Sequence, residues 1–362
     1  MSASHPTIAA PPELLNSKEL AAVGNISVYH LNAVGDMLFS LPPLLALRQL
    51  FPGAKITSIV RPHLRELLEP AHLIDEIILR PHNSKSAAGI AFVQELRSRH
   101  FDLAVLFSQS ASTNLFALLS GAPARVGFID TIFPWLLSHV IQLTGITCTA
   151  KLLYLTEWLG AKPQKRDYVG MLKVSPENQD KAAALLQKAG LGNESFAVFS
   201  FAQGPGAMPN YKAWRPEHFI ELGQRLLKQG IRPVMLGAKS DLAEGQHFAE
   251  EIGPGAVSLA GKTSLGELAG VIQQAMLAVG IDSGPAHLAA ALEVPLVALF
   301  GPTDPTVTGP PGRNCTILRH PQPCIPCRKP SCTDRPCITT ITPEEVLAAA
   351  EKLIANQASG QS

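Results

Sequence analysis

Short apolar runs alternate with amphipathic stretches along most of the chain. The apolar runs are typical of buried parallel strands. Within the amphipathic stretches, apolar residues recur about every 3.6 positions, which is typical of helices. The runs that predict strands are 26–31, 55–60, 76–79, 103–107, 196–200, 233–236, 277–281, 296–300 and 315–318, with an edge segment at 256–259. The stretches that predict helices are 37–50, 64–68, 87–99, 151–159, 177–189, 216–229, 242–252, 265–274 and 343–355. This alternation predicts an α/β fold with doubly wound parallel sheets.

The pattern also divides the chain into two domains. Between residues 144 and 194 the strand signals fade, and two helical stretches are joined by the charged, proline-containing segment 162–167. A second strand–helix series begins at 196. We therefore expect a loose tail (1–24), an N-terminal domain (25–170), a linker region (171–193), a C-terminal domain (194–342), and a final helix and tail (343–362). Pro42 and Pro43 interrupt the helical pattern of 37–50, which predicts a kink or a late start there.

Composition narrows the class of protein. The 362 residues carry a formal net charge of +1, so the basic excess of a nucleic-acid-binding protein is lacking. The first twenty residues have neither the basic region nor the apolar core of a signal peptide. No run reaches the roughly 18 apolar residues that span a bilayer. We expect a soluble, cytoplasmic protein that contacts at most the surface of a membrane.

The most informative stretch follows the apolar run 277–281. Asp282 or Ser283 suits the cap of the alanine-rich helix that comes next, and Pro285 suits its first turn. The carboxyl ends of adjacent parallel strands form the ligand-binding edge of an open α/β sheet, and a helix N-terminus there faces anions such as a diphosphate. The alternative is that Gly284 and Pro285 serve only as turn residues.

Further polar residues converge on the same edge. His287 lies one turn into the helix, and Thr303 and Asp304 follow the next strand, 296–300. A histidine satisfied within its helix is the alternative for His287. The convergence favours a binding site.

The first strand leads to Gly35-Asp36. An Asp directly before a helix is most often a helix cap, but its place at the end of a strand favours a functional carboxylate. The chain contains neither a G-x-x-x-x-G-K-[ST] loop nor a G-x-G-x-x-G turn after this strand, which argues against a P-loop protein and a classical NAD-binding domain.

These motifs resemble glycosyltransferase family 9, the ADP-heptose:lipopolysaccharide heptosyltransferases. The resemblance rests on 31–42 (LNAVGDMLFSLP), 282–292 (DSGPAHLAAAL), 299–305 (LFGPTDP) and Lys212-Ala-Trp214, and extends from residue 26 to the final helix. The sequence departs from the family pattern at two positions. Ser283 stands where the family commonly has Thr, and His30 stands near a position where the family frequently has Arg. A Cys-x-x-Cys loop is shared as well.

The resemblance implies a GT-B fold, with two Rossmann-like domains facing across a cleft, an N-terminal one for the acceptor and a C-terminal one for the nucleotide sugar. It implies transfer of heptose from ADP-L-glycero-D-manno-heptose, with inversion, to a lipid A–Kdo core acceptor at the inner membrane surface. Asp36 would be the general base. Lys212 would neutralise the donor phosphates without a metal, although a solvated loop lysine is the alternative. The residues implied to line the donor pocket are Asp282, Ser283, Gly284, His287 and Thr303.

Polar residues after strands of the N-terminal domain are candidates for acceptor contacts. They are Arg61, His63, Ser108, Gln109 and Arg125, and ordinary surface polarity is the alternative for each. Two other functions stay open. One is a related family 9 glycosyltransferase with another nucleotide sugar or a protein acceptor, and the other is a two-domain binding protein without catalysis.

Four cysteines near the C-terminus form the remaining constellation. Cys324, Cys327, Cys332 and Cys337 can supply four thiolates to a structural zinc ion, although zinc sites usually use two close pairs. An iron–sulfur cluster is a weaker alternative. The other reading is reduced cysteines that pack a proline-rich loop.

Overall fold

The computed structural model describes residues 20–82, 87–143, 147–202, 212–327 and 332–359. The chain forms two compact units. The first unit takes the chain up to Asn32, Phe39–Pro62 and His72–Asp167, and the second takes Ala33–Leu38, His63–Ala71 and the chain from Tyr168 onward. Among the described helices, none combines the length and the apolarity needed to cross a lipid bilayer.

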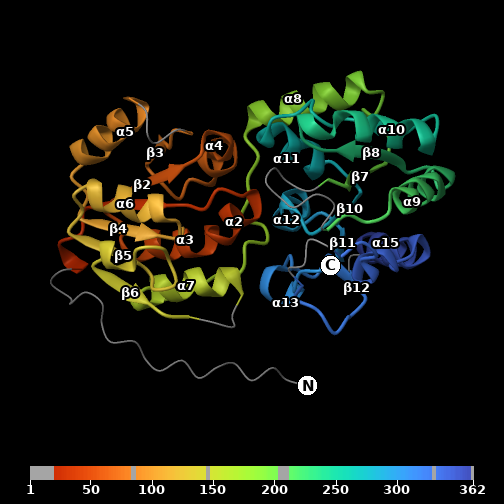
Figure 1. Ribbon diagram of the computed structural model, residues 1–362. Coiled ribbons are helices and arrows are strands. Elements are labelled where there is room, and N and C mark those ends of the chain that lie inside the picture. The colour runs from red at the N-terminus through yellow and green to blue at the C-terminus, as the bar shows by residue number, and fades with distance from the viewer. Residues whose placement is uncertain (1–19, 83–86, 144–146, 203–211, 328–331, 360–362) are drawn as a thin grey trace. The chain divides into compact units, whose positions relative to one another are not determined.

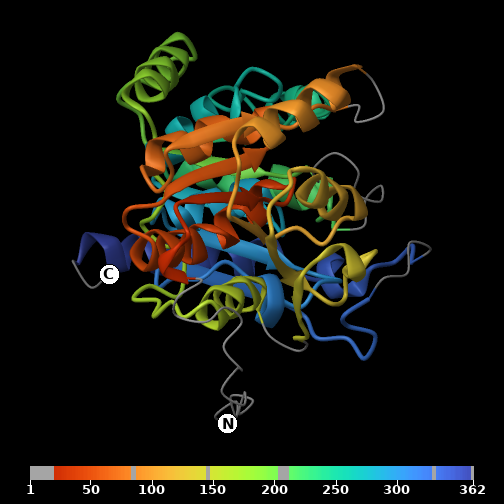
Figure 2. The same cartoon turned by 90° about the vertical axis from the view of Figure 1, so that its left-hand side faces the viewer.

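The first unit contains a six-stranded, all-parallel sheet in the order β3-β2-β1-β4-β5-β6 (Figures 1 and 2). The strand order reverses between β1 and β4, which is the switch point at which doubly wound sheets bind ligands. The strands are β1 (Asn25–Tyr29), β2 (Lys55–Val60), β3 (Glu76–Leu79), β4 (Leu103–Leu106), β5 (Ala124–Phe128) and β6 (His139–Ile141).

The helices of this unit bury a core of aromatic and aliphatic side chains on the sheet. Phe92 and Phe116 meet edge to face at 4.9 Å between ring centroids, and both belong to the core. The elements are α3 (Leu41–Leu50), α5 (Ala87–Ser98), α6 (Ala111–Leu119), η3 (Pro134–Leu136) and α7 (Cys148–Trp158). The apolar pattern did not predict α6, β5 or β6. Strand β6 has three residues, and only Ile141 among them is buried, so it lacks the continuous apolar run of a central strand.

The interruption predicted near Pro42 and Pro43 is confirmed. Residues 37–50 are not one helix, because α2 (Val34–Phe39) ends before Ser40 and α3 begins at Leu41. The two prolines occupy the first turn of α3, where their missing N–H groups break no hydrogen bond. The break allows α2 to belong to the second unit while α3 belongs to the first.

The second unit repeats the same topology, with the order β12-β11-β10-β7-β8-β9, all parallel, and its switch point lies between β7 and β10 (Figure 1). Three predicted strand runs, 196–200, 277–281 and 296–300, match the observed strands residue for residue. The strands are β7 (Phe196–Ser200), β8 (Arg232–Leu236), β9 (Val257–Ser258), β10 (Leu277–Ile281), β11 (Leu296–Phe300) and β12 (Cys315–Arg319).

The helices of the second unit cover a core that includes Phe199, Trp214, Phe219 and Phe248. Trp214 is buried, and its indole N–H donates to the carbonyl of Ile341 at 2.8 Å. The elements are α2, η1 (Pro62–Leu64, which begins at the end of the first unit), α4 (Arg65–Leu68), η2 (Glu69–Ala71), α8 (Pro176–Lys188), α9 (Pro216–Lys228), η4 (Lys239–Asp241), α10 (Leu242–Ile252), α11 (Leu265–Gln273), α12 (Gly284–Ala291), α13 (Pro305–Thr308), α14 (Pro336–Thr339) and α15 (Pro343–Ala358).

Capping side chains fix where two of these helices begin. Thr342 and Glu345 form a reciprocal capping box at the start of α15. Ser264 and Glu267 form another at α11. Glu66 of α4 adds a carboxylate there, accepting from the Ser264 hydroxyl at 2.6 Å and from the Gly266 N–H at 2.7 Å. A negative charge at a helix N-terminus is stabilising, which ties α4 to the second unit.

Candidate active site

Asp282 is the centre of a polar network at the carboxyl end of β10. Its carboxylate is 8% exposed. Lys212 Nζ donates to Oδ2 at 2.6 Å and to the main-chain carbonyl of the same residue at 3.3 Å. The hydroxyl of Thr303, which follows β11, donates to Oδ2 at 2.7 Å. Oδ1 lies 3.8 Å from His287 Nε2. The structure thus gathers three of the predicted site residues, Lys212, Thr303 and His287, around the carboxylate of a fourth, Asp282.

These neighbours keep Asp282 ionised. Burial alone would raise the pKa of this carboxyl, but His287, Lys212 and Thr303 hold the pKa down at about 2. A carboxylate that is saturated by donors serves as an anchor for the cation and the hydroxyl around it. The network therefore holds Lys212 at the switch-point edge of the sheet before any ligand arrives.

A pair of serines spans the switch point itself. Ser200 ends β7, Ser283 follows β10, and their hydroxyl oxygens are 2.9 Å apart. Of the two residues predicted as candidates for the cap of α12, Asp282 and Ser283, the N-cap residue is Ser283, but its side chain makes no capping hydrogen bond within the described structure. The first N–H groups of α12 are therefore not satisfied by that side chain, and they face the edge at which a ligand is expected. Gly284 is the first residue of this eight-residue helix.

His287 is buried in α12 and is held from two sides. Its Nδ1 lies 2.6 Å from the phenol oxygen of Tyr168, and its Nε2 faces Asp282. Neither Tyr168 nor Ser200 is among the site residues predicted from the sequence. Ser200 ends an apolar run and could have been found by the rule that identified Asp282. Tyr168 carries no such signal, because its partner is 119 residues away in the sequence.

Two glycines allow α2 to approach α12 within the second unit. A Cβ atom on Gly35 would lie 2.9 Å from Cδ2 of His287, and one on Gly284 would lie 2.9 Å from Cβ of Val34. Both distances are shorter than any side chain tolerates, so the contact requires glycine at both positions. The approach places the first turn of α2, which carries Asp36, beside the His287 ring.

Asp36 is half-buried, and burial raises the pKa of its carboxyl, while the nearby His287 and Lys212 side chains oppose that rise. A carboxylate with a raised pKa accepts a proton more readily than an ordinary Asp. His287 and Lys212, the two groups that lower the pKa of Asp36, also contact Asp282. The structure therefore places a potential base next to the cation that a departing anion would need.

The residues predicted for acceptor contacts are not gathered in the same way. In the first unit, Arg61 donates to the carbonyl of Pro81 at 2.8 Å, and Gln109 donates to Asp130 at 2.7 Å. His63 is exposed in η1 and belongs to the second unit. Each is thus held in a different setting, and their role in acceptor binding stays a prediction.

His30, at the position near a frequent family Arg, is a buried core residue. Its ring nitrogens lie 2.8 Å from the Ser40 hydroxyl and 3.0 Å from the Ser58 hydroxyl, and the side chain is 3% exposed. Burial lowers the pKa of His30 to about 3, so the ring is neutral at pH 7. A buried neutral imidazole binds the two serines and is unsuited to an anionic acceptor.

This burial predicts a pH-dependent stability. Between the unfolded pKa of about 6.5 and the folded pKa of about 3, only the unfolded chain protonates His30. The free energy of unfolding should therefore fall as pH drops through this window, by up to ~1.4 kcal/mol per pH unit. Urea unfolding at pH 6.5, 5.5 and 4.5 should show a shallower loss in His30→Asn, which lacks this group, than in the parent. Equal pH slopes would contradict a buried neutral His30.

The four C-terminal cysteines do not form a ready-made metal site. Among the residues that the structure describes, no three His, Cys, Asp or Glu side chains are grouped closely enough to hold a metal ion. Cys324 and Cys332 are exposed, and Cys337 is buried. Burial raises the pKa of Cys337, and the nearby Cys324, Cys332 and Cys327 raise it further, which favours the thiol over the thiolate that zinc binds. Structural zinc stays a prediction.

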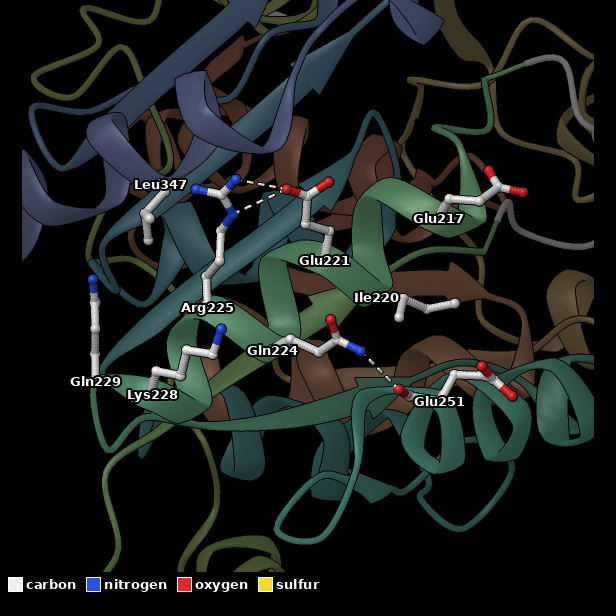
Figure 3. A pocket seen from close by; sticks show the side chains of 9 residues that line it. All are labelled: Glu217, Ile220, Glu221, Gln224, Arg225, Lys228, Gln229, Glu251 and Leu347. Carbon is white, nitrogen blue, oxygen red and sulfur yellow. Dashed lines mark hydrogen bonds and ion pairs between the residues drawn. The ribbon is translucent and has the colours of Figure 1, made fainter.

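A surface hollow of about 860 Å³ lies elsewhere on the second unit (Figure 3). Helix α9 supplies most of its described lining, with Glu251 and Leu347 from α10 and α15. Arg225 is paired with Glu221 at 2.6 Å, and Gln224 donates to the main-chain carbonyl of Glu251 at 3.0 Å. The predicted site residues are not among those that line it.

Known proteins match most of the chain. The family model for glycosyltransferase family 9 (heptosyltransferase) matches residues 90–338. Lipopolysaccharide heptosyltransferase 3 of Escherichia coli is 26% identical over 343 residues, which cover 91% of this chain and 98% of that protein. Lipopolysaccharide heptosyltransferase 2 of Escherichia coli K12 is 26% identical over 306 residues, which cover 79% and 85%.

Solved structures confirm the predicted GT-B fold class. A family 9 glycosyltransferase from Veillonella parvula has a TM-score of 0.82 at 24% identity, covering 92% of this chain and 98% of its own. The Escherichia coli ADP-heptose heptosyltransferase II has a TM-score of 0.76 at 24% identity, covering 92% and 99%. Escherichia coli WaaC with ADP-2-deoxy-2-fluoro heptose has a TM-score of 0.69 at 21% identity, covering 91% and 99%. Since the family model spans well over half of the sequence, this chain belongs to glycosyltransferase family 9 and is a glycosyltransferase.

Proposed function

We propose that this protein is an inverting heptosyltransferase that moves heptose from ADP-L-glycero-D-manno-heptose to the inner core of lipopolysaccharide. The observation that carries the proposal is the Asp282–Lys212–Thr303 network at the switch point of the second sheet, with Asp36 beside it. The curated relatives named above are lipopolysaccharide heptosyltransferases, and one solved relative holds an ADP-heptose analogue.

The donor's diphosphate would bind between Lys212 and the N-terminus of α12. Lys212 supplies a full positive charge, and the first N–H groups of α12 supply donors and the positive end of the helix dipole. Lys212 donates a hydrogen bond to Asp282 at 2.6 Å, so the diphosphate would share the lysine with this carboxylate. Ser283, Gly284, His287 and Thr303 would line the pocket around the sugar and the phosphates.

The reaction is a single displacement. Asp36 would take the proton from the acceptor hydroxyl as its oxygen forms a bond to the anomeric carbon of the heptose. The bond from that carbon to the diphosphate breaks, and ADP leaves with the electron pair. Attack from the face opposite to ADP inverts the anomeric configuration. Lys212 and the α12 N–H groups would stabilise the charge that grows on the leaving phosphate.

The acceptor is lipid-linked, so we place the enzyme at the inner surface of the cytoplasmic membrane, with no nucleic acid as partner. The direct test offers purified protein ADP-heptose together with lipid A–Kdo acceptors of increasing core length. ADP release and a product heavier by one heptose are expected with one acceptor of the series. UDP- and GDP-sugars serve as donor controls. Transfer from one of those donors, with none from ADP-heptose, would instead favour a family 9 enzyme with another nucleotide sugar.

Removal of metal ions is expected to leave turnover within about twofold, because Lys212 and a helix N-terminus supply the positive charge. Within the described part of the chain, the site also holds no carboxylate cluster of the kind that Mg²⁺ prefers. Turnover is measured before and after EDTA treatment, with added Mg²⁺ as the reference. A loss of turnover that Mg²⁺ restores would contradict this prediction.

Elemental analysis of the same sample tests structural zinc on Cys324 and its neighbours. About one zinc ion per chain is expected in the parent protein and none in Cys324→Ser.

A further inference from the structure

The first unit carries a concentrated group of exposed apolar side chains. Of the ten large hydrophobic residues that are exposed in the described structure, six lie between residues 115 and 135. We call them the apolar patch: Leu115, Leu118, Ile129, Ile132, Phe133 and Trp135. Trp135 is 72% exposed and Ile132 is 60% exposed. Exposed apolar residues are normal singly, but a group of this kind marks an interaction surface.

Hydrogen bonds hold the two parts of the patch together. Asn114 of α6 donates through its side-chain amide to the hydroxyl of Thr131 at 3.0 Å and to the carbonyl of Ile132 at 2.9 Å. Leu115 and Leu118 of α6 therefore lie on a helix that is fastened to the loop bearing Ile132, Phe133 and Trp135. Strands β5 and β6, which flank this loop in the sequence, can be followed in Figure 1.

The loop holds its rings outward. Phe133 has a φ of 63°, an unfavourable value for a residue with a side chain, and its ring packs edge to face on Trp135 at 5.1 Å between centroids. Nonetheless both rings stay exposed, at 44% and 72%. An unfavourable backbone conformation that presents two aromatic rings to solvent is a feature of binding surfaces.

The charges around the patch fit an anionic partner. Between residues 108 and 143 the sequence has one carboxylate, Asp130, and Lys151 pairs with it at 2.7 Å. Arg125 donates to the main-chain carbonyls of Leu136 at 2.9 Å and of Ala122 at 2.6 Å, so its positive charge is not cancelled by these partners. Counted together, Arg125 and Lys151 exceed the single carboxylate Asp130 by one formal positive charge, so the surroundings of the apolar rings are weakly cationic.

The patch is continuous with the predicted acceptor edge of the first sheet. Gln109 follows β4, whose carboxyl end lies at the switch point, and Thr131 of the patch loop donates to the Gln109 carbonyl at 2.6 Å. The Gln109 side chain also donates to Asp130 at 2.7 Å. A lipid-linked acceptor whose sugar reached this edge would have its acyl chains and bilayer next to the patch.

We infer that the apolar patch docks on the surface of an anionic phospholipid bilayer, with Phe133 and Trp135 entering the headgroup region. Trp is enriched at membrane–water interfaces, because its ring contacts apolar groups while its N–H hydrogen-bonds to water. A neighbouring cation adds electrostatic attraction to anionic lipid. The inference deepens the proposed function and rests on it for the link to the acceptor. Docking itself can be measured without any acceptor.

The first experiment measures sedimentation of the full-length protein with vesicles of phosphatidylglycerol and phosphatidylethanolamine that contain no acceptor. The double variant Phe133→Ser/Trp135→Ser should lower the vesicle partition coefficient at least ~10-fold, because two interfacial aromatic anchors are lost. The matched control is Ile90→Ser, which removes another apolar side chain of the same unit, 65% exposed on α5. Ile132→Ser should give a smaller decrease. Circular dichroism and melting temperature confirm that each variant is folded.

The second experiment separates docking from catalysis. Turnover is measured with an acceptor in vesicles and with a deacylated, water-soluble acceptor. The double variant should lose activity only on vesicles. Equal vesicle binding by parent and double variant, or a parent that binds no vesicles and dimerises through this patch, overturns the inference while leaving the proposed function intact. Vesicle binding that depends on Trp135 in a protein that transfers no heptose supports the surface and overturns the proposed function instead.

Discussion

Asp36→Asn is expected to lower turnover by at least ~100-fold while leaving ADP affinity nearly unchanged, since general-base catalysis typically contributes ~10²–10⁴-fold. The substitution preserves size and hydrogen-bonding capacity, but removes the group that accepts the proton. Burial raises the pKa of the Asp36 carboxyl, so kcat/KM of the parent should fall as pH drops through that raised pKa. This acidic limb should be missing from the residual activity of Asp36→Asn.

The control for this prediction is Asp180→Asn, which changes an exposed carboxylate of α8 in the second unit. Turnover in the control should match the parent. ADP titration by calorimetry separates a loss of chemistry from a loss of donor binding. Near-normal turnover in Asp36→Asn would reduce Asp36 to a residue of the first turn of α2. A large loss of ADP affinity would assign it to the donor pocket.

The edge of the second sheet at the carboxyl ends of β10 and β11, where the donor is proposed to bind, was the most predictable part of this protein. Strands β10 and β11 are buried along their whole length, so each appears in the sequence as an unbroken apolar run. Once these runs are recognised as parallel strands, their carboxyl ends must meet at one edge. The closeness of Asp282 to Thr303 then follows from topology, and the structure joins them at 2.7 Å.

Contacts made by packing between distant segments were beyond the sequence pattern. Nothing in the periodicity of α2 shows that it leaves the first unit, or that Gly35 lies against His287. The pairing of Tyr168 with His287 depends equally on tertiary packing. The strands β5 and β6 were missed for another reason. Their residues are partly exposed, and Arg125 interrupts the apolar run of β5 in order to bind main-chain carbonyls.

The pairing of Lys212 with Asp282 changes what the donor site must do. The lysine was expected to be available for phosphate, but its ammonium lies 2.6 Å from a carboxylate whose pKa is held at about 2. Because Asp282 also accepts from Thr303, it can stay ionised while Lys212 turns part of its charge to a diphosphate. Asp282 therefore serves to hold the lysine in place.

Lys212→Ala is accordingly expected to weaken ADP binding by about 1–3 kcal/mol, or about 5- to 150-fold in Kd, the range for a hydrogen bond to a charged group. Two effects contribute to this loss of affinity. The diphosphate loses the attraction of the lysine, and it faces the Asp282 carboxylate, which no longer has its lysine partner. Lys212→Arg should recover part of the affinity. Calorimetric titration of each folded variant with ADP measures the effect, and Lys228→Ala, an exposed lysine of α9, is the matched control.

The double variant Lys212→Ala/Asp282→Ala decides between those two parts. If repulsion by Asp282 contributes, removal of that carboxylate should restore some of the ADP affinity that Lys212→Ala loses, and the two substitutions will not be additive. If only the missing cation matters, the double variant will bind ADP as weakly as Lys212→Ala or more weakly. Unchanged ADP affinity in a folded Lys212→Ala would remove the lysine from the donor site and leave the N-terminus of α12 as the remaining candidate for the diphosphate.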